Sequence, residues 1–275
     1  MIETLQSHYG FTIMPFTAAI PATALFGSTA HKEAVARLRW LISARGLGVL
    51  TGEVGSGKTA AVRAAVSGLD ASRHTLIYLP NPQLGVRGIH GALATALGQA
   101  PRFHHATLIP QVEAALAAEA DERNRHVILA VDESHLLTSE QLEAVRMLTT
   151  HDLDSGSPLT ILLIGQPTLR LRLRVGAMAA LDQRVQLRYH IPAPALTAAE
   201  ANGYLRAHLT LAGRSDTLFS DDAVRAIHAH ARGMPRAINL LAITALMAAC
   251  STGKTIADES SARTAISEEA AAATD

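Results

Sequence analysis

Residues 52–59 read GEVGSGKT, and this stretch decides the fold. It matches the pattern G-x-x-x-x-G-K-[ST], in which the glycines let the backbone curl so that several N–H groups point at phosphate oxygens. A short apolar strand is expected directly before it, at Gly48–Thr51, and a helix is expected to begin at Lys58 and Thr59. The positive end of that helix dipole faces the same phosphates. The sequence therefore predicts a phosphate-binding loop between a strand and a helix.

The residue types of the loop predict a site for ATP and Mg²⁺. Lys58 can reach the β- and γ-phosphates, and Thr59 offers a hydroxyl to the metal. We expect the metal to arrive with ATP and expect no zinc, because the histidines show no recognised zinc spacing with Cys or acids. The expected nucleotide-binding residues of this loop are Gly52, Glu53, Val54, Gly55, Ser56, Gly57, Lys58, Thr59 and Ala60.

A second apolar strand, His126–Val131, ends in two acids, Asp132 and Glu133. Asp132 at the strand tip can hold the shell of the Mg²⁺ ion. Glu133 beside it would orient and deprotonate an attacking water. A nucleotide-dependent switch needs no such base, so Glu133 favours a hydrolase over a switch. Taken alone, the two acids would be an ordinary polar strand end; the loop upstream gives them this interpretation.

Strands and helices alternate along the chain up to Pro194. Apolar runs predict strands at Gly48–Thr51, His74–Leu79, His126–Val131, Leu159–Ile164 and Gln186–Ile191. Amphipathic or capped segments predict helices between them, for instance at Thr29–Ala44 and Leu108–Glu122. This alternation predicts an α/β fold with a parallel sheet and helices on both faces.

The pattern changes after Pro194 and divides the chain into four regions. Thr197 and Glu200 form a capping box that opens a small all-helical domain over residues 195–250. Residues 29–194 are the α/β nucleotide-binding domain. Residues 1–28 are expected to be irregular but to pack on the body, because they are rich in aromatic side chains. Residues 251–275 show no hydrophobic period, and we expect a mobile tail.

Three further polar residues are candidates for the site. Gln166 follows the fourth strand, which would lie beside the first or third, so it could position the water; an ordinary turn residue is the alternative. Arg184 lies just before the fifth strand, placed to reach a neighbouring subunit's nucleotide; a solvated arginine is the alternative, and Arg188 competes for this role. Arg236 opens the last helix and could touch the γ-phosphate; a surface arginine is the alternative.

Composition excludes several classes of protein. The 275 residues are 48% hydrophobic, which excludes disorder, and the single cysteine, Cys250, excludes a disulfide scaffold. Lys+Arg and Asp+Glu are 24 each, which argues against indiscriminate coating of nucleic acid but permits a local basic stripe. Residues 1–10 lack the features of a signal peptide, and the apolar run Ala237–Cys250 is too short to span a bilayer. We therefore expect a cytoplasmic protein with no membrane contact.

These pieces, in this order, resemble the AAA+ ATPases of the ExeA and TnsC/TniB type over residues 8–250. The resembling pieces are Tyr9-Gly10-Phe11 with Pro15-Phe16, Gly52–Thr59, Asp132-Glu133, Gly165-Gln166-Pro167, Arg184 and Gly233–Asn239. The resemblance implies an AAA+ fold with a C-terminal helical lid. It implies these roles: Lys58 and Thr59 in Walker A, Asp132 and Glu133 in Walker B, Gln166 as sensor 1, Arg184 as arginine finger, Arg236 as sensor 2, and Tyr9, Gly10 and Phe11 lining the adenine pocket. Many relatives carry Asn rather than Gln at sensor 1.

The resemblance also implies a function. Secretion ATPases of the ExeA type carry a membrane segment and a cell-wall-binding region, and neither is visible in these residues. The expected function is therefore that of an ATPase regulating DNA transposition, which assembles as an ATP-stabilised hexameric ring or helical filament on double-stranded DNA and delivers this target to a DDE transposase. The alternatives are a secretion or envelope motor acting on protein, and a helicase-loader type replication ATPase.

The basic residues support DNA binding only locally. Residues 80–105 carry Arg87 and Arg102 with few acids, and in the resembled family the DNA contacts come from this region, so these two are the DNA-binding candidates. A solvated loop is the alternative. A second cluster, Arg170, Arg172 and Arg174, would share one side of an extended segment but would spread around a helix, where a subunit interface is equally consistent. Contacts to the DNA backbone would be tolerant of sequence.

Overall fold

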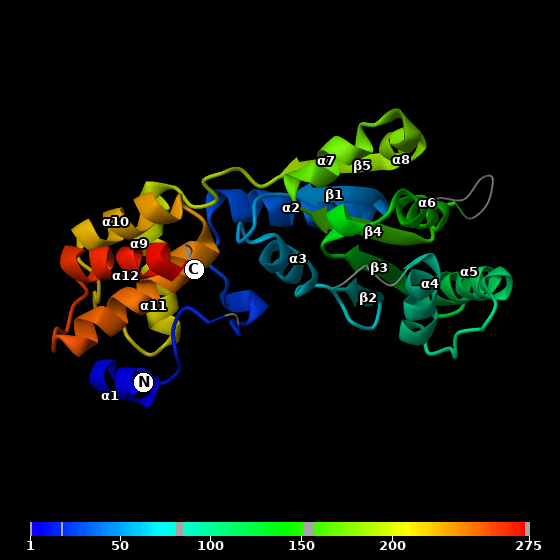
Figure 1. The fold of residues 1–275 in the computed structure, drawn as a ribbon. Coiled ribbons are helices and arrows are strands. Elements are labelled where there is room, and N and C mark those ends of the chain that lie inside the picture. Colours follow the sequence, from blue (N-terminus) through cyan, green and yellow to red (C-terminus); the bar gives the residue numbers. More distant parts are fainter. Residues whose placement is uncertain (1, 18, 81–84, 151–156, 273–275) are drawn as a thin grey trace. The chain divides into compact units, whose positions relative to one another are not determined.

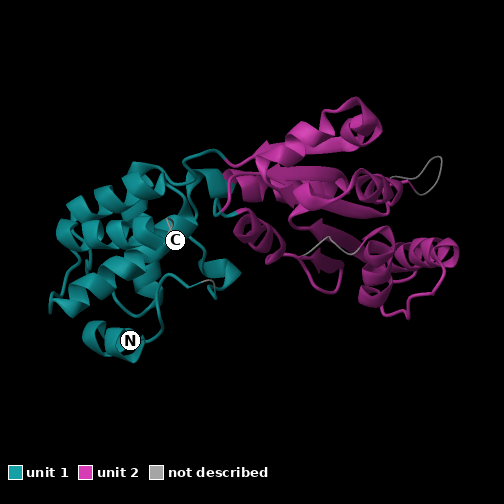
Figure 2. Cartoon of the chain, viewed as in Figure 1, with its two compact units in different colours: residues 1–32, 55–57, 192–275 teal, residues 33–54, 58–191 magenta. Residues whose placement is uncertain are grey.

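The chain forms two compact units, each with its own hydrophobic core (Figure 2). The computed structural model describes residues 2–17, 19–80, 85–150 and 157–272. The sheet unit comprises residues 33–54 and 58–191, and the helical unit comprises residues 1–32, 55–57 and 192–275. The boundary near residue 192 lies close to the point where the sequence pattern changes.

A parallel sheet of five strands forms the centre of the sheet unit (Figure 1). Its order is β2-β3-β4-β1-β5, and every neighbouring pair is parallel. In register, Val49 of β1 pairs with Leu163 of β4 and with Arg188 of β5. The strands are β1 (Leu47–Thr51), β2 (His74–Leu79), β3 (His126–Val131), β4 (Leu159–Gly165) and β5 (Val185–His190). The predicted parallel α/β fold is confirmed.

Helices cover both faces of this sheet, which explains why β3 and β4 are apolar and buried along their whole length. On one face, Leu41 of α2 and Val62 of α3 pack beside Ile128 of β3. On the other face, α4 to α8 contribute to a core that includes Val49 and Leu129. The helices are α2 (Thr29–Ala44), α3 (Lys58–Val66), α4 (Gly85–Ala96), α5 (His105–Asp121), α6 (Ser139–Met147), α7 (Pro167–Leu173) and α8 (Ala179–Arg184).

The helical unit is built around three helices whose starts are set by their caps. The capping box predicted at Thr197 and Glu200 is present, and Ser220 caps the next helix through its side chain. The three helices are α9 (Ala198–Leu211), α10 (Asp221–Ala231) and α11 (Pro235–Ser251). The apolar run Ala237–Cys250 lies within α11, and in the described parts of the chain no helix is long and apolar enough to cross a membrane.

The sequence predicts an irregular amino-terminal arm, and this prediction is wrong for its first residues. Ile2–Tyr9 forms helix α1, whose inner face carries Leu5 and Tyr9, four positions apart and both buried. The hydroxyl of Tyr9 donates a hydrogen bond of 3.0 Å to the carbonyl oxygen of Leu246 in α11. A short 3-10 helix, η1 (Ala22–Ala24), follows before α2. The arm therefore packs within the helical unit.

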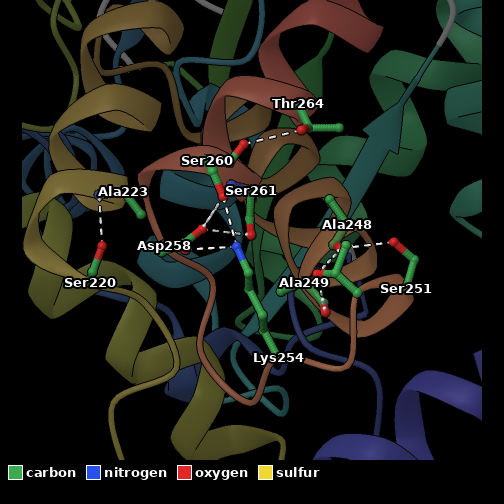
Figure 3. A network of polar contacts seen from close by, with 11 residues as sticks. Ser220, Ala223, Ala248, Ala249, Ser251, Lys254, Asp258, Ser260, Ser261 and Thr264 are labelled. Atoms are coloured by element: carbon green, nitrogen blue, oxygen red, sulfur yellow. Dashed lines mark hydrogen bonds and ion pairs between the residues drawn. The ribbon is translucent and has the colours of Figure 1, made fainter.

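The prediction of a mobile tail is wrong for most of its length, because Glu259–Ala272 forms helix α12. Asp258 fixes the start of this helix by accepting hydrogen bonds from Lys254, Ser260 and Ser261 (Figure 3). Ala262 and Ala265 are fully buried in the core of the helical unit. Small residues make this buried face, so the sequence lacked the period of large apolar side chains that identifies an amphipathic helix. Residues 273–275 lie outside the described residues.

Candidate active site

The loop Gly52–Thr59 joins the end of β1 to the start of α3, as predicted. Gly55 has φ +78° and Gly57 has φ +92°, a backbone region that only glycine enters without a steric penalty. The buried Nζ of Lys58 donates hydrogen bonds of 2.9 Å to the carbonyl oxygens of Gly52 and Glu53. The ammonium group is thus held against the loop at the end of β1.

Asp132 connects three elements of the sheet unit. Its Oδ2 accepts a hydrogen bond of 2.9 Å from Thr59 Oγ1 at the start of α3 and one of 2.7 Å from the hydroxyl of Tyr78 in β2. Its Oδ1 accepts from the backbone N–H of Glu133 at 2.9 Å. The carboxylate is buried, with 6% of its residue surface exposed. The two residues predicted to bind the metal, Thr59 and Asp132, are therefore in direct contact.

Tyr78 is a site residue that the sequence prediction missed. Burial, together with the hydrogen bond to Asp132, raises the pKa of its hydroxyl well above the usual range. The pairing of β2 with β3 accounts for this contact, because it places Tyr78 opposite Ala130, one pair before the strand ends; the sequence alone does not give this pairing. The side chain of Tyr78 therefore reaches the acid that follows β3.

Glu133 sits in an unusual backbone conformation next to Asp132. Its φ of 49° and ψ of 32° place it in the left-handed region, which non-glycine residues rarely adopt and which recurs at functional sites. Its carboxylate is 49% exposed, and Oε2 lies 3.3 Å from Nδ1 of His135. The conformation turns the carboxylate away from the buried position of Asp132 and leaves it accessible to water.

Gln166 follows β4, and β4 lies between β3 and β1 in the sheet. Because the carboxyl ends of parallel strands meet at one edge, Gln166 lies at the same edge as Thr51 and Asp132. It caps the start of α7 through its position, yet its side chain makes no capping hydrogen bond. The fourth strand is expected beside the first or the third, and β4 lies between the two; the role of Gln166 in positioning water stays a prediction.

The three arginine candidates occupy different surroundings. Arg184 is exposed at the end of α8 and donates a hydrogen bond of 2.9 Å to Thr149 Oγ1. Its competitor Arg188 is paired with Asp182 at 3.0 Å. Arg236 is exposed at the second position of α11, and its backbone N–H lies 3.4 Å from the carbonyl oxygen of Gly55 within the helical unit. Among the described residues, Arg188 has a carboxylate partner and Arg184 has none.

Tyr9, Gly10 and Phe11 lie in the helical unit. Tyr9 and Phe11 are buried in its core with their rings stacked at 5.3 Å, and Gly10 has φ +67°. Their proposed part in an adenine pocket stays a prediction.

Both DNA-binding candidates meet in the loop between α4 and α5. Arg87 projects from α4 and donates hydrogen bonds to the carbonyl oxygens of Phe103, at 3.0 Å, and Arg102, at 3.4 Å. Arg102 is exposed. The guanidinium group of Arg87 is therefore already used in holding this loop.

The cluster Arg170, Arg172 and Arg174 lies on and just after helix α7, so its members spread as expected for a helix. Arg172 donates a hydrogen bond of 2.6 Å to the carbonyl oxygen of His135. Arg170 and Arg174 line a cavity of about 350 Å³ with Arg188.

The residues present fit a nucleotide and its metal. The Oγ of Ser56 is buried without a hydrogen-bond partner among the described residues, as expected of a hydroxyl that a phosphate oxygen would satisfy. Lys58 supplies a cation, and the hydroxyl of Thr59 with the carboxylate of Asp132 forms a pair of hard oxygen ligands suited to Mg²⁺.

A protein family and one curated relative match this chain. Residues 41–173 match the protein family described as "AAA domain". The chain is 33% identical over 249 residues to the general secretion pathway protein A of Aeromonas hydrophila. The aligned residues make up 89% of this chain and 45% of that protein. The chain thus spans a little under half the length of this relative.

Two solved structures share the fold. The ORC2 protein of Aeropyrum pernix, solved as ADPNP and ADP complexes, has a TM-score of 0.70 and 18% identity, covering 92% of this chain and 71% of that chain. The ORC1 protein of Aeropyrum pernix in complex with DNA has a TM-score of 0.66 and 16% identity, covering 97% of this chain and 69% of that chain. At these identities the likeness concerns the fold.

Proposed function

We propose that this chain is an ATPase of the AAA type, whose domain model matches residues 41–173, and that it hydrolyses ATP with Mg²⁺ at the carboxyl edge of β1, β3 and β4. The observation that carries this proposal is the 2.9 Å hydrogen bond between Thr59 Oγ1 and Asp132 Oδ2. It joins the phosphate-binding loop to the acidic strand end, which lie 73 positions apart in the sequence. This pairing is what a Mg²⁺–nucleotide site requires.

Binding would proceed by exchange of partners within the loop. The Nζ of Lys58 would leave the carbonyl oxygens of Gly52 and Glu53 for the β- and γ-phosphates, and Ser56 Oγ would gain an acceptor. Thr59 and Asp132 would hold the metal between them. Bound Mg²⁺ would withdraw electron density from the phosphoryl oxygens and neutralise charge that develops on them.

Hydrolysis needs a base and a positioned water. Glu133, exposed beside Asp132, would take the proton of the attacking water, and Gln166 at the neighbouring strand end would orient that water. Arg184 would act on the nucleotide of a neighbouring subunit, and Arg236 would contact the γ-phosphate. Tyr9, Gly10 and Phe11 would line the adenine pocket.

The finer proposal is that this ATPase binds duplex DNA and regulates transposition as an oligomer. The sequence resemblance to TnsC/TniB proteins supports it, and so do the basic residues Arg87 of α4 and Arg102 of the following loop. The DNA complex of the ORC1 protein, which has the same fold, is compatible with it. A secretion motor that acts on protein is the second candidate, and the 33% identity to the general secretion pathway protein A favours it.

The ATPase rate with and without duplex DNA distinguishes these functions. A DNA-directed ATPase should turn over faster with DNA, and Glu133→Gln should lower turnover by roughly 10²- to 10⁴-fold and accumulate as assemblies on DNA visible by negative-stain microscopy. Turnover that ignores DNA, with no assemblies, would leave the ATPase assignment intact and favour the secretion-type motor. No turnover under any condition, with wild-type protein and Mg²⁺, would contradict the proposed chemistry.

A further inference from the structure

Phe103 is the most exposed large apolar side chain of the described residues. It lies in the loop between α4 and α5, and 80% of its surface is accessible. A fully exposed phenyl ring forgoes the roughly 1.5–3 kcal/mol that burial of such a side chain contributes. A single exposed apolar side chain needs no partner by itself, so the surroundings of Phe103 decide whether it has one.

The loop that carries Phe103 is held firmly from two sides. Arg87 donates to the carbonyl oxygens of Phe103 and Arg102, and its guanidinium carbon lies 5.7 Å from the centre of the phenyl ring. Gln111 of α5 donates to the carbonyl oxygen of Ala100 at 2.9 Å and accepts from the backbone N–H of Arg102 at 3.0 Å. These bonds fix the backbone and prevent the loop from folding over to bury the ring.

The charge around this ring identifies the chemistry of its partner. No Asp or Glu occurs between Asp70 and Glu113, while Arg87, Arg102, His104 and His105 surround the ring in sequence. The ring of His104 contacts that of Phe103 edge to face at 5.2 Å. Positive charge from Arg87 and Arg102 beside one projecting aromatic ring complements a polyanion that has flat apolar faces, and a nucleic acid combines both properties.

We propose that Phe103 inserts between neighbouring base pairs of duplex DNA, and that Arg87 is a positioning residue which holds the ring outward. The proposal rests on the DNA binding proposed above. Apolar side chains inserted between base pairs partly unstack one step and kink the duplex. Pyrimidine–purine steps deform most easily, so the chain would prefer sites with TA or CA steps without any hydrogen bond to a base edge.

The test measures affinity and base unstacking on one duplex. The probe is a 30-base-pair duplex with 2-aminopurine beside a single TA step; its fluorescence rises when the base unstacks. Wild-type protein with a non-hydrolysable ATP analogue should increase this fluorescence. Phe103→Ala should abolish the increase and weaken binding about 5- to 150-fold, the range measured for loss of base–aromatic stacking. Phe103→Trp should restore both, and Arg87→Ala should reduce both.

The matched control is Trp40→Ala, which removes an exposed aromatic side chain from α2, where 55% of it is accessible. It should leave fluorescence and affinity unchanged, and its DNA-independent ATPase rate should match that of the wild type. Unchanged affinity and fluorescence in Phe103→Ala, while the wild type binds, would overturn this proposal and leave DNA binding intact. Failure of the wild type to bind would overturn both. A changed oligomeric state in Phe103→Ala without a fluorescence change would show that the ring packs on another copy.

Discussion

The hydroxyl of Tyr78 donates a hydrogen bond of 2.7 Å to Oδ2 of Asp132, the same oxygen that accepts from Thr59. Two donors on one carboxylate oxygen fix its orientation before any metal arrives. Tyr78 thereby acts as an outer partner of the proposed metal site, and such partners tune metal affinity without touching the metal.

Tyr78→Phe removes one of these donors and keeps the ring. We expect the Mg²⁺ concentration for half-maximal ATPase activity to rise about tenfold, with turnover at saturating Mg²⁺ little changed. A titration of ATPase rate against Mg²⁺ measures this. Tyr189→Phe is the control, because Tyr189 lies in β5 near Arg37 and away from Asp132. An unchanged Mg²⁺ midpoint would mean that the hydrogen bond from Tyr78 does not tune metal binding at Asp132.

Arg184 is proposed to act on the nucleotide of another subunit, and mixing two inactive variants tests this directly. Arg184→Ala and Lys58→Ala should each lose most ATPase activity, because one lacks the arginine and the other the phosphate ligand. If the site is shared, mixed assemblies contain some intact sites and should recover a measurable part of the wild-type rate. Arg188→Ala in place of Arg184→Ala is the comparison. No recovery in any mixture would contradict this proposal. Arg184 would then act on the nucleotide of its own subunit or take no part in hydrolysis.

His208 makes the helical unit sensitive to acid. Burial lowers the pKa of its imidazole from 6.5 to about 4, and Nδ1 lacks a partner among the described residues. Between pH 6.5 and pH 4 this imidazole is protonated in the unfolded chain but not in the folded protein. The free energy of unfolding is therefore highest above pH 6.5 and falls as the pH approaches 4, by roughly 3 kcal/mol at most.

His208→Phe should remove this part of the pH dependence while keeping contacts with Phe16 and Tyr204. Urea unfolding at pH 7.5 and pH 5, followed by circular dichroism, measures the difference between the two variants. His104→Gln, an exposed site, should retain the wild-type slope. An equal slope in His208→Phe would show that other groups dominate the response to acid, among them His126 in the sheet unit, whose pKa is also lowered to about 4 by burial.

Helix α12 is predicted to be an integral part of the helical unit. Ala265→Glu would place an unpaired carboxylate at a fully buried position and should destabilise the protein by about 3 kcal/mol. Ala271→Glu on the exposed end of the same helix should change stability by less than about 0.5 kcal/mol. Thermal unfolding compares the two. Equal melting temperatures would indicate that α12 detaches at little cost.

Much of the sheet unit could be predicted because its signals are local. Glycine and lysine spacing identified the loop at Gly52–Thr59, and uninterrupted apolar runs identified strands buried on both faces. Helices α1 and α12 could not be predicted. Helix α1 is only eight residues long, too short to show a hydrophobic period, and the buried face of α12 is made of small residues rather than large apolar ones. Tyr78 and Phe103 were missed for another reason: an aromatic residue reads as core unless its neighbours in space are known.

The order of the strands in the sheet has a consequence for how the chain is made. Strand β1, which lies inside the sheet, pairs with β4 and β5, at Val49 with Leu163 and Arg188, so both of its partners leave the ribosome long after it does. At usual rates of synthesis this delay is on the order of ten seconds. Throughout that interval Leu47–Thr51 is an unpaired apolar segment, and the loop after it has no sheet to hold it. A fragment that ends before Leu159 would therefore be prone to aggregate and unable to bind nucleotide, whereas one that ends after His190 would contain every strand.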